Sequence, residues 1–342
     1  MRRVERATLK EVAKRAGVHP ATASRALNAA TRSLVNAETA ERVDQAARQL
    51  GYTPNPIARS LKTSRSASIG LLLPDITNPL FPPIVRGIED VLGTVGYNAW
   101  IVNTDNDPDR ESAAIESFRG RSVEGFVVAT ARLEHPLLQE LAATGTPMVL
   151  VNRRVANPSI PSVTPDDAAG VAMAMRHLHD LGHREIVHLA GPQDLSTGVV
   201  RRQAFRQALE DLRLPAGPGR VVGCTTWSEA AGAEAMEKLI ASGVPYTAVL
   251  AGNDLIALGC YDVLRAQALT CPADVSVVGF NDTPLMHRVD PPLTSVRVPH
   301  YEIGAEAARL LLEVLGDAAR HPRSLLLPLT LSVRGSTGPP PA

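Results

Sequence analysis

The sequence predicts an all-α head of three short helices, followed by a larger α/β core of two lobes, each built on a doubly wound parallel sheet. The length of 342 residues exceeds what one hydrophobic core supports and fits two or three domains. Residues 1–65 carry 13 basic and five acidic side chains, a net charge of +8, which leaves −8 on the remainder. After residue 66 the apolar pattern changes from helical spacing to short β-branched runs that alternate with helical segments. A basic module joined to an acidic one indicates that only the first meets a polyanion.

The composition excludes several classes of protein. A hydrophobic fraction of 44% supplies real cores and argues against a mainly disordered chain. Charges occupy the opening residues, where a signal peptide needs an apolar stretch, and no run of about 18 apolar residues is present. We therefore expect a cytoplasmic protein without a spanning helix. Cys224, Cys260 and Cys271 are odd in number and widely spaced, which predicts neither a disulfide framework nor a zinc site.

Three amphipathic helices are predicted in the head. Thr8 and Glu11 form a Thr-x-x-Glu capping box at the start of the first helix, and Gly17 offers a left-handed stop. A proline in its first turn suits a second helix over residues 20–27, and a third is predicted over residues 37–50. This order, in which a tight turn joins the first two helices and a loop leads to the third, is typical of helix-turn-helix DNA-binding domains. Plain three-helix bundles share it.

Two motifs make the head more specific. Residues 9–28 read LKEVAKRAGVHPATASRALN, and residues 51–62 read GYTPNPIARSLK. Both resemble the lactose/galactose repressor family of bacterial transcriptional regulators, in which DVA..AGVS..TVSRVLN and GY.PN..AR.L are typical at this separation. The resemblance implies a helix-turn-helix DNA-binding domain over residues 1–53 and a hinge helix or linker over residues 54–66.

The second helix of such a head lies in the major groove, and residues near its start reach base edges. Arg25 matches the family's groove-reading arginine, whose fork pairs with guanine O6 and N7; the alternative is a solvated helix charge. Pro20 and Ala21 match the specificity positions but offer only apolar contact. His19 replaces the usual serine, which predicts a weaker or pH-sensitive helix cap. The DNA contacts expected in the head are Thr8, His19, Pro20, Ala21, Thr22, Ser24, Arg25 and Asn28.

The hinge carries its own expectations. Pro54 and Pro56 prevent a helix before Ile57, and the segment that follows is too short to be a stable helix alone. In the family this segment folds on DNA, pairs with its dimer mate and inserts a leucine into the minor groove, and Leu61 is the matching residue. A flexible linker with an exposed leucine is the alternative. The expected hinge contacts are Asn55, Ala58, Arg59, Leu61 and Lys62.

From residue 67 to about 335, short apolar runs alternate with helical patterns, which is typical of parallel sheets covered on both faces. Helical patterns include residues 84–95 and 204–212. The predicted strands are residues 69–73, 99–102, 126–128, 148–151, 186–190, 248–251 and 275–280.

The resemblance extends over this part, on HLHDLGHR at 177–184, VLAGNDLIALG at 249–259, VSVVGFND at 275–282 and PLTSV at 292–296. It implies a periplasmic-binding-protein-like core over residues 67–335 with a ligand cleft at the carboxyl ends of the strands. The expected ranges are 67–164 and 297–324 for lobe 1, 165–296 and 325–335 for lobe 2, and 336–342 for a tail.

Candidate effector contacts follow from the resemblance. Arg201, next to Arg202, matches the family's ligand-binding arginine, and Trp227 matches an aromatic that stacks on the ligand. Asn281 stands where an aspartate is frequent, which removes a strong acceptor for a pair of sugar hydroxyls. This mixture suits a polyhydroxylated ligand, while loop packing for Trp227 and turn roles for the asparagines are the alternatives. The expected effector contacts are Asn78, Phe81, Asn152, Arg201, Trp227, Asn253 and Asn281, and Asp254 is expected to be structural.

Motifs for enzyme chemistry are missing. The sequence has no Walker A loop, nucleophile elbow, H-E-x-x-H or G-x-G-x-x-G. His177, His179 and His183 suggest a metal site, but residues two apart face different sides of a helix, and Gly182 ends the helix before the third. We therefore expect no catalytic residue, no cofactor and no metal.

Together these observations predict a ligand-responsive, sequence-specific DNA-binding regulator, with a repressor as the first choice. It would bind a near-palindromic operator as a homodimer and sense a small polar effector such as a sugar between its lobes. A bilobal solute-binding receptor without DNA function would leave residues 1–62 unexplained. An enzyme with a DNA-binding appendage would need a catalytic constellation that the sequence lacks. The last six residues have no heptads, which favours a dimer over a tetramer.

Overall fold

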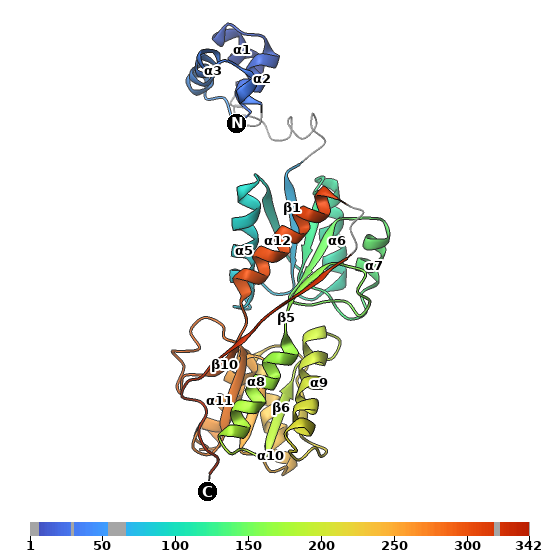
Figure 1. Cartoon of the computed structure of the whole chain (residues 1–342), viewed down its shortest axis with the longest axis vertical. Coiled ribbons are helices and arrows are strands. Elements are labelled where there is room, and N and C mark those ends of the chain that lie inside the picture. Colours follow the sequence, from blue (N-terminus) through green and yellow to red (C-terminus); the bar gives the residue numbers. More distant parts are fainter. Residues whose placement is uncertain (1–6, 29–30, 54–65, 318–321, 342) are drawn as a thin grey trace, which may run out of the picture. The chain divides into compact units, whose positions relative to one another are not determined.

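The structure is a computed structural model that describes residues 7–28, 31–53, 66–317 and 322–341 (Figure 1). The chain divides into two compact units, a head of residues 1–66 and a core of residues 67–342, and each is described here by itself. Within the described ranges, no helix is long and apolar enough to cross a membrane.

The head has a hydrophobic core of its own. Val12, Ala23 and Val43 are fully buried where its helices meet. Because this core lies entirely within the head, the module does not depend on the larger unit for its apolar packing. Its elements are α1 (Leu9–Ala16), α2 (Pro20–Ala26), the 3₁₀-helix η1 (Arg32–Leu34) and α3 (Ala37–Leu50).

The local signals at the first helix are confirmed. The hydroxyl oxygen of Thr8 accepts a hydrogen bond from the Glu11 amide at 3.4 Å, and the Glu11 carboxylate accepts one from the Thr8 amide at 2.7 Å. The second of these bonds, from the Thr8 amide to the carboxylate, lowers the pKa of Glu11 below its ordinary value. Gly17 adopts φ 64°, a left-handed conformation that costs glycine no Cβ clash, and turns the chain toward α2.

The start of α3 gives a first testable prediction. The Asn36 side chain accepts a hydrogen bond from the Thr39 amide at 2.8 Å, which satisfies one free donor of the helix. Asn36→Ala is expected to destabilise the head by about 1 kcal/mol, because that amide loses its partner. Hydrogen exchange of the α3 amides would measure the change, with the mid-helix variant Gln45→Ala as the control. Equal protection in both variants would show that the cap contributes nothing.

The two parallel-sheet lobes that the sequence predicts are present, and within the described residues each contains a six-stranded sheet (Figure 1). The first has the strand order β11-β5-β4-β3-β1-β2 and is entirely parallel. The second has the order β12-β10-β9-β8-β6-β7 and is parallel except for β12, which runs antiparallel to β10. The strands are β1 (Ser68–Leu73), β2 (Asn98–Asn103), β3 (Gly125–Val128), β4 (Met148–Val151), β5 (Ser162–Pro165), β6 (Ile186–Ala190), β7 (Val221–Gly223), β8 (Ala248–Ala251), β9 (Ser276–Asn281), β10 (Thr294–Arg297), β11 (Ser324–Leu327) and β12 (Thr330–Ser332).

Helices cover both faces of each sheet. In the first sheet, the successive residues Leu71 and Leu72 pack on opposite sides, the former with α5 and α12 and the latter with α6 and α7. In the second, α8 and α9 lie on one face while α10 and α11 lie on the other. The helices are α5 (Phe81–Thr94), α6 (Pro108–Gly120), α7 (Pro136–Ala143), α8 (Asp167–Asp180), α9 (Ser196–Asp211), α10 (Glu229–Ser242), α11 (Asp254–Ala266) and α12 (His300–Gly316).

The chain crosses between the lobes three times, and the third crossing corrects an expectation. The predicted border between residues 324 and 325 falls inside β11, which pairs with β5 in the first sheet. The return to the second sheet occurs between Leu327 and Thr330, where β12 begins. Residues 325–331 read LLLPLTL, a mainly apolar segment in which the sequence pattern does not mark where the chain changes sheets.

The expected tail, residues 336–342, also needs correction, because its first residues belong to the second lobe. Ser336 is fully buried, donates a hydrogen bond to the carbonyl of Val277 at 2.6 Å and accepts one from the Thr294 amide at 2.8 Å. Gly338 continues the contact through its amide, which bonds the Ser276 hydroxyl at 3.1 Å. This segment closes the side of the lobe at β9 and β10.

Candidate functional site

The exposed face of α2 is the candidate nucleic-acid interface. This helix buries Ala23 and Ala26 in the head and leaves His19, Ala21 and Arg25 exposed. The Arg25 guanidinium makes no hydrogen bond or ion pair within the described part of the head. A free fork on an exposed helix face is the arrangement that reads guanine in the major groove.

His19 caps α2 in place of the usual serine. Its Nδ1 accepts a hydrogen bond from the Ala21 amide at 3.2 Å. Only an unprotonated Nδ1 can accept, so protonation of this ring would remove the cap. This hydrogen bond is the contact through which the predicted pH sensitivity of the cap would arise.

The remaining predicted DNA contacts divide into two groups. Thr8 is exposed, but its hydroxyl oxygen serves the capping box of α1. Thr22, Ser24 and Asn28 are half-buried along α2 and after it. The hinge residues Asn55, Ala58, Arg59, Leu61 and Lys62 lie outside the described residues.

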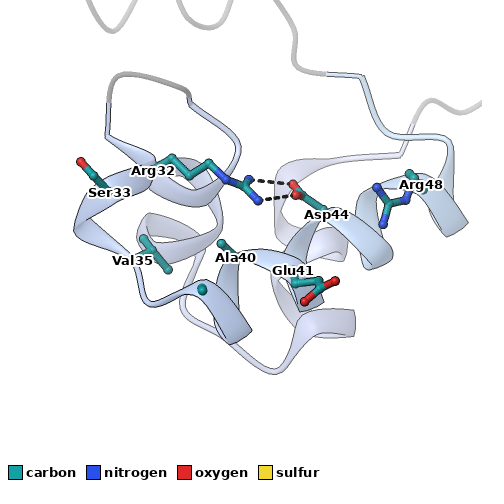
Figure 2. A pocket seen from close by; sticks show the side chains of 8 residues that line it. Arg32, Ser33, Val35, Ala40, Glu41, Asp44 and Arg48 are labelled. Carbon is teal, nitrogen blue, oxygen red and sulfur yellow. Dashed lines mark hydrogen bonds and ion pairs between the residues drawn. The ribbon is translucent and has the colours of Figure 1, made fainter.

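A second feature of the head is a hollow of about 650 Å³ between η1 and α3 (Figure 2). At its edge Arg32 forks onto the Asp44 carboxylate at 2.7 and 3.2 Å, and it also donates to the carbonyl of Ala26 at 3.0 Å. These bonds fasten η1 to the end of α2 and to the middle of α3. Arg32 is thus paired with a carboxylate of the head itself, in contrast to Arg25.

Arg201 organises the candidate effector site in the second lobe. Its guanidinium bonds the Asp167 carboxylate at 2.8 Å through Nε and Nη2 and the carbonyl of Gly252 at 2.7 Å through Nη1. It also lies over the Phe280 ring, 3.7 Å from its centre. At 3% exposure this side chain is balanced by Asp167 and held rigidly, so it can present its remaining N–H donors in a fixed direction.

Trp227 lies beside this arginine, in the loop between β7 and α10. The Arg201 guanidinium carbon is 5.5 Å from the centre of its ring. A Cβ atom at Gly191 would come within 2.1 Å of the ring, and one at Gly252 within 3.1 Å. The indole therefore rests on the glycines that follow β6 and β8, at the carboxyl ends of the strands where ligands of α/β sheets bind.

The predicted asparagines behave in two ways. Asn78 and Asn253 accept hydrogen bonds from backbone amides, of Leu80 at 3.2 Å and Ile256 at 2.8 Å, so their carbonyl oxygens support local turns. Asn152 and Asn281 are 6% and 5% exposed and have positive φ angles at the ends of β4 and β9, and their side chains form no hydrogen bond within the described residues.

Asn152 and Asn281 are therefore the stronger candidates for ligand contact, since their amide groups are free to bind one. Phe81 is 1% exposed and belongs to the hydrophobic core of the first lobe.

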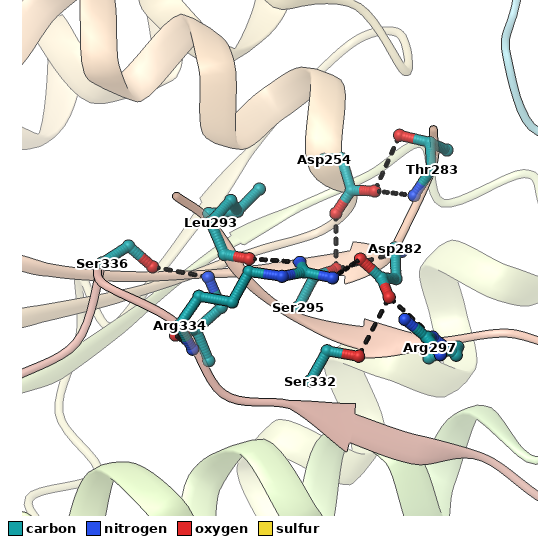
Figure 3. A network of polar contacts seen from close by, with 10 residues as sticks. Asp254, Asp282, Thr283, Leu293, Ser295, Arg297, Ser332, Arg334 and Ser336 are labelled. Carbon is teal, nitrogen blue, oxygen red and sulfur yellow. Dashed lines mark hydrogen bonds and ion pairs between the residues drawn. The ribbon is translucent and has the colours of Figure 1, made fainter. Parts of the chain in front are cut away.

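A polar network beside Asn281 holds the second lobe together (Figure 3). Asp254 accepts hydrogen bonds from the amide and hydroxyl of Thr283 at 2.7 and 2.9 Å and from the Ser295 hydroxyl at 2.6 Å. Burial raises the pKa of Asp254 to about 6. All its oxygens are occupied by protein groups, so the structural role expected for it is confirmed.

Asp282 completes the network from the end of β9. It accepts hydrogen bonds from Arg297 at 2.7 Å and Ser332 at 2.9 Å and pairs with Arg334 at 2.7 Å (Figure 3). Burial alone raises the pKa of Asp282, but these partners outweigh burial and lower the pKa below its ordinary value. The network ties β12 and the segment after it to β9 and β10.

The sequence reasoning missed Arg153. It directly follows Asn152 and is 5% exposed, and its Nε and Nη1 have no hydrogen-bond partner among the described residues. The loops around it meet the second lobe, through the Arg154 amide on the Ser196 hydroxyl at 3.0 Å and the Leu133 amide on the Asp194 carbonyl at 2.9 Å. In the sequence Arg153 and Arg154 look like an ordinary pair of loop charges. Only the tertiary structure shows that the first is buried and the second exposed.

The histidines and cysteines make no metal site in the described part of the chain. His177 bonds the Thr337 hydroxyl at 3.0 Å, and the ring nitrogens of His183 face the Thr247 hydroxyl at 2.8 Å and the Gly338 carbonyl at 2.9 Å. His177 and His183 thus fasten the C-terminal segment to the second lobe. The three cysteines are free.

Comparisons with known proteins agree with this geometry. Residues 8–55 match the model described as bacterial regulatory proteins of the lacI family, and residues 175–337 match a periplasmic binding protein-like domain. The chain is 34% identical to the HTH-type transcriptional repressor CytR of Escherichia coli (strain K12), over 97% of this chain and 96% of the relative. It is 35% identical to the ribose operon repressor of Bacillus subtilis (strain 168), over 97% and 98%. A crystal structure of the lac repressor dimer bound to operator and the anti-inducer ONPF superposes with a TM-score of 0.86 at 26% identity, over 98% and 100%.

Proposed function

This chain belongs to the lacI family of bacterial regulatory proteins, and from that premise we infer that it is a transcriptional repressor that binds a near-palindromic operator as a homodimer. The observation that carries the proposal is the exposed face of α2, with the free guanidinium of Arg25 on a head of net charge +8. As a regulator of bacterial transcription it would act where the DNA lies, in the cytoplasm.

Two-fold symmetry follows from the way such heads read DNA. One α2 reaches only a few base pairs, so a specific site needs two heads on half-sites about one helical turn apart. A homodimer supplies them with the symmetry of a palindrome. Thr22, Ser24 and Asn28 would fix the register by phosphate contacts, and Arg25 would read sequence.

The effector is a small polar metabolite bound between the lobes. Arg201 and Trp227 support this assignment from the second lobe, and Asn152 supports it from the first. The sugar-like class follows from the mixture of amides, a fixed guanidinium and one flat aromatic ring, which suits hydroxyls and an apolar sugar face. Binding there would change the relative position of the first lobes in the dimer and the spacing of the hinges, with a coupling of about 1–3 kcal/mol.

The alternative, a bilobal solute-binding receptor without DNA function, is disfavoured by the head. The function of such a receptor does not require a basic head that packs around its own core and exposes a guanidinium on its second helix. A catalytic role is not proposed, because the close relatives of this chain are transcriptional repressors.

The hinge gives a testable prediction that depends on the family resemblance. Leu61→Ser is expected to weaken operator binding about tenfold or more while changing binding to random DNA little, because a wedge that unstacks bases needs an apolar tip. Fluorescence anisotropy with operator and scrambled duplexes at one salt concentration would measure both affinities. Equal losses on the two duplexes would contradict the wedge.

A gel-retardation assay tests the proposed function as a whole. Genomic fragments from the source organism, at low ionic strength, are expected to yield a few strongly retained sequences with two-fold symmetry. Binding that depends only on charge, with no preferred DNA sequence, would contradict the proposed function.

A further inference from the structure

His19 holds the start of α2, the helix that we expect to read DNA. The carbonyl of His19 accepts hydrogen bonds from the amides of Thr22 at 2.9 Å and Ala23 at 3.1 Å. Pro20 has no amide hydrogen, so the Ala21 amide is the one donor of this first turn that depends on a side chain. The Nδ1 atom of His19 accepts its hydrogen bond at 3.2 Å. The order of the first turn therefore depends on the lone pair of one imidazole nitrogen.

His19 has no acidic partner in the described part of the head. The ring is exposed, and no charged side chain of α2 or of the elements that pack against it forms a hydrogen bond or ion pair with it there. These side chains are Lys10, Glu11, Lys14 and Arg15 on α1, Arg25 on α2, Arg32 on η1, and Glu38, Glu41, Arg42, Asp44 and Arg48 on α3. Two of the carboxylates are already bound, Glu11 by Thr8 and Asp44 by Arg32. The charge of the ring therefore follows the pH of the solvent.

Protonation of His19 has two effects on the head, and they act differently on specific and general DNA binding. It removes the acceptor of the Ala21 amide and places a positive charge at the positive end of the helix dipole, so the first turn of α2 loses order. Pro20 and Ala21 lie in that turn, at the end of the helix that reaches base edges. The same proton adds one positive charge to a head of net charge +8, which strengthens binding to any duplex.

We propose that His19 makes operator recognition sensitive to pH, because its neutral ring caps α2 and its protonated ring releases the cap. This rests on the proposed function, since it assumes that α2 reads DNA. Histidine side chains change charge between about pH 5 and 8. Selectivity for operator over random DNA is therefore high above that range and falls as the pH drops through it. A serine, which the family usually has at this position, accepts the same hydrogen bond without titrating, so the pH dependence is a property of the histidine.

The test compares the affinities of the full chain for an operator duplex found by gel retardation and for a scrambled duplex, at about pH 6 and about pH 8 and one ionic strength. For the wild type, the ratio of operator to scrambled affinity is expected to fall about fivefold at the lower pH, the factor that corresponds to loss of a helix cap. The affinity for the scrambled duplex is expected to rise. Higher salt should diminish that rise but not the fall of the ratio, because salt screens charge attraction and leaves the cap intact.

Three variants separate the cap from other effects of pH. His19→Ser keeps an acceptor that does not titrate, and its affinity ratio is expected to be high at both pH values. His19→Ala has no acceptor, so its ratio should be low at both. His179→Gln, near the end of α8 in the second lobe, is the matched control and should keep the pH profile of the wild type.

A wild-type affinity ratio that is the same at both pH values would overturn the proposal. A His19→Ser variant whose ratio falls as much as that of the wild type would overturn it too, because another group would then be titrating. A ratio near one at about pH 8, for both the wild type and His19→Ser, would contradict the proposed function and this inference with it, since sequence recognition itself would be missing.

Discussion

An effector that stabilises the wild-type protein is expected to leave the Trp227→Ala variant unresponsive. The indole rests on Gly191 and Gly252 and lies 5.5 Å from the fixed guanidinium of Arg201. Removal of the ring deletes the one large flat apolar surface among the candidate contacts of the second lobe in the described residues. A loss of stacking and burial of this size weakens binding tenfold or more, because about 1.4 kcal/mol corresponds to a factor of ten.

The measurement is the operator affinity with and without effector. The variant is expected to bind operator as the wild type does, because the head packs around a hydrophobic core of its own, but effector should no longer change that affinity. Trp227→Phe keeps a ring and should keep part of the response. Trp100→Ala, in the first lobe, is the matched control and should respond fully. A Trp227→Ala variant that still responds would exclude the stacking role.

The Arg25→Ala substitution is expected to weaken operator binding by about 1–3 kcal/mol and to relax the preference at one base pair of each half-site. The guanidinium is exposed on α2 and free of partners in the described part of the head, so removing it costs no internal contact. The effect should therefore fall on DNA recognition and leave the stability of the head unchanged.

Arg42→Ala is the matched control for this variant. Arg42 is exposed on α3, and its removal lowers the net charge of the head by the same amount. It is expected to weaken binding to all sequences alike, as loss of a general electrostatic contribution does. Affinities for a set of operators with single base changes would separate the two effects. If the Arg25→Ala variant keeps the same order of base preferences as the wild type, Arg25 does not read the DNA sequence.

The head and most of the sheets could be predicted from sequence because their signals are local. The capping box at Thr8, the left-handed Gly17 and the β-branched runs each depend on neighbouring residues alone. β5 and β7 carry weaker signals, since the first contains Ser162, Thr164 and a terminal proline, and the second has only three residues. Neither forms the continuous apolar run that predicts a buried strand.

The candidate site could be predicted only in part, because its decisive features are tertiary. Family resemblance identified Arg201 and Trp227, but the pairing of Arg201 with Asp167 joins residues 34 apart in the sequence. The difference between Asn152, whose amide is free, and Asn253, which caps α11, depends on backbone geometry. Nothing in the sequence distinguishes the isolated Arg153 from its exposed neighbour.

The account depends on a division of labour in which the basic head selects a DNA sequence and the lobes alter that selection when a metabolite binds. The most direct test is selection of bound duplexes from a random DNA library by the full chain, at fixed ionic strength, with and without an effector found by thermal shift. We expect enrichment of one near-palindromic sequence and a change of about 5–150-fold in its affinity when effector is added. A pool that stays random, or an enriched sequence whose affinity ignores every stabilising ligand, would contradict the account.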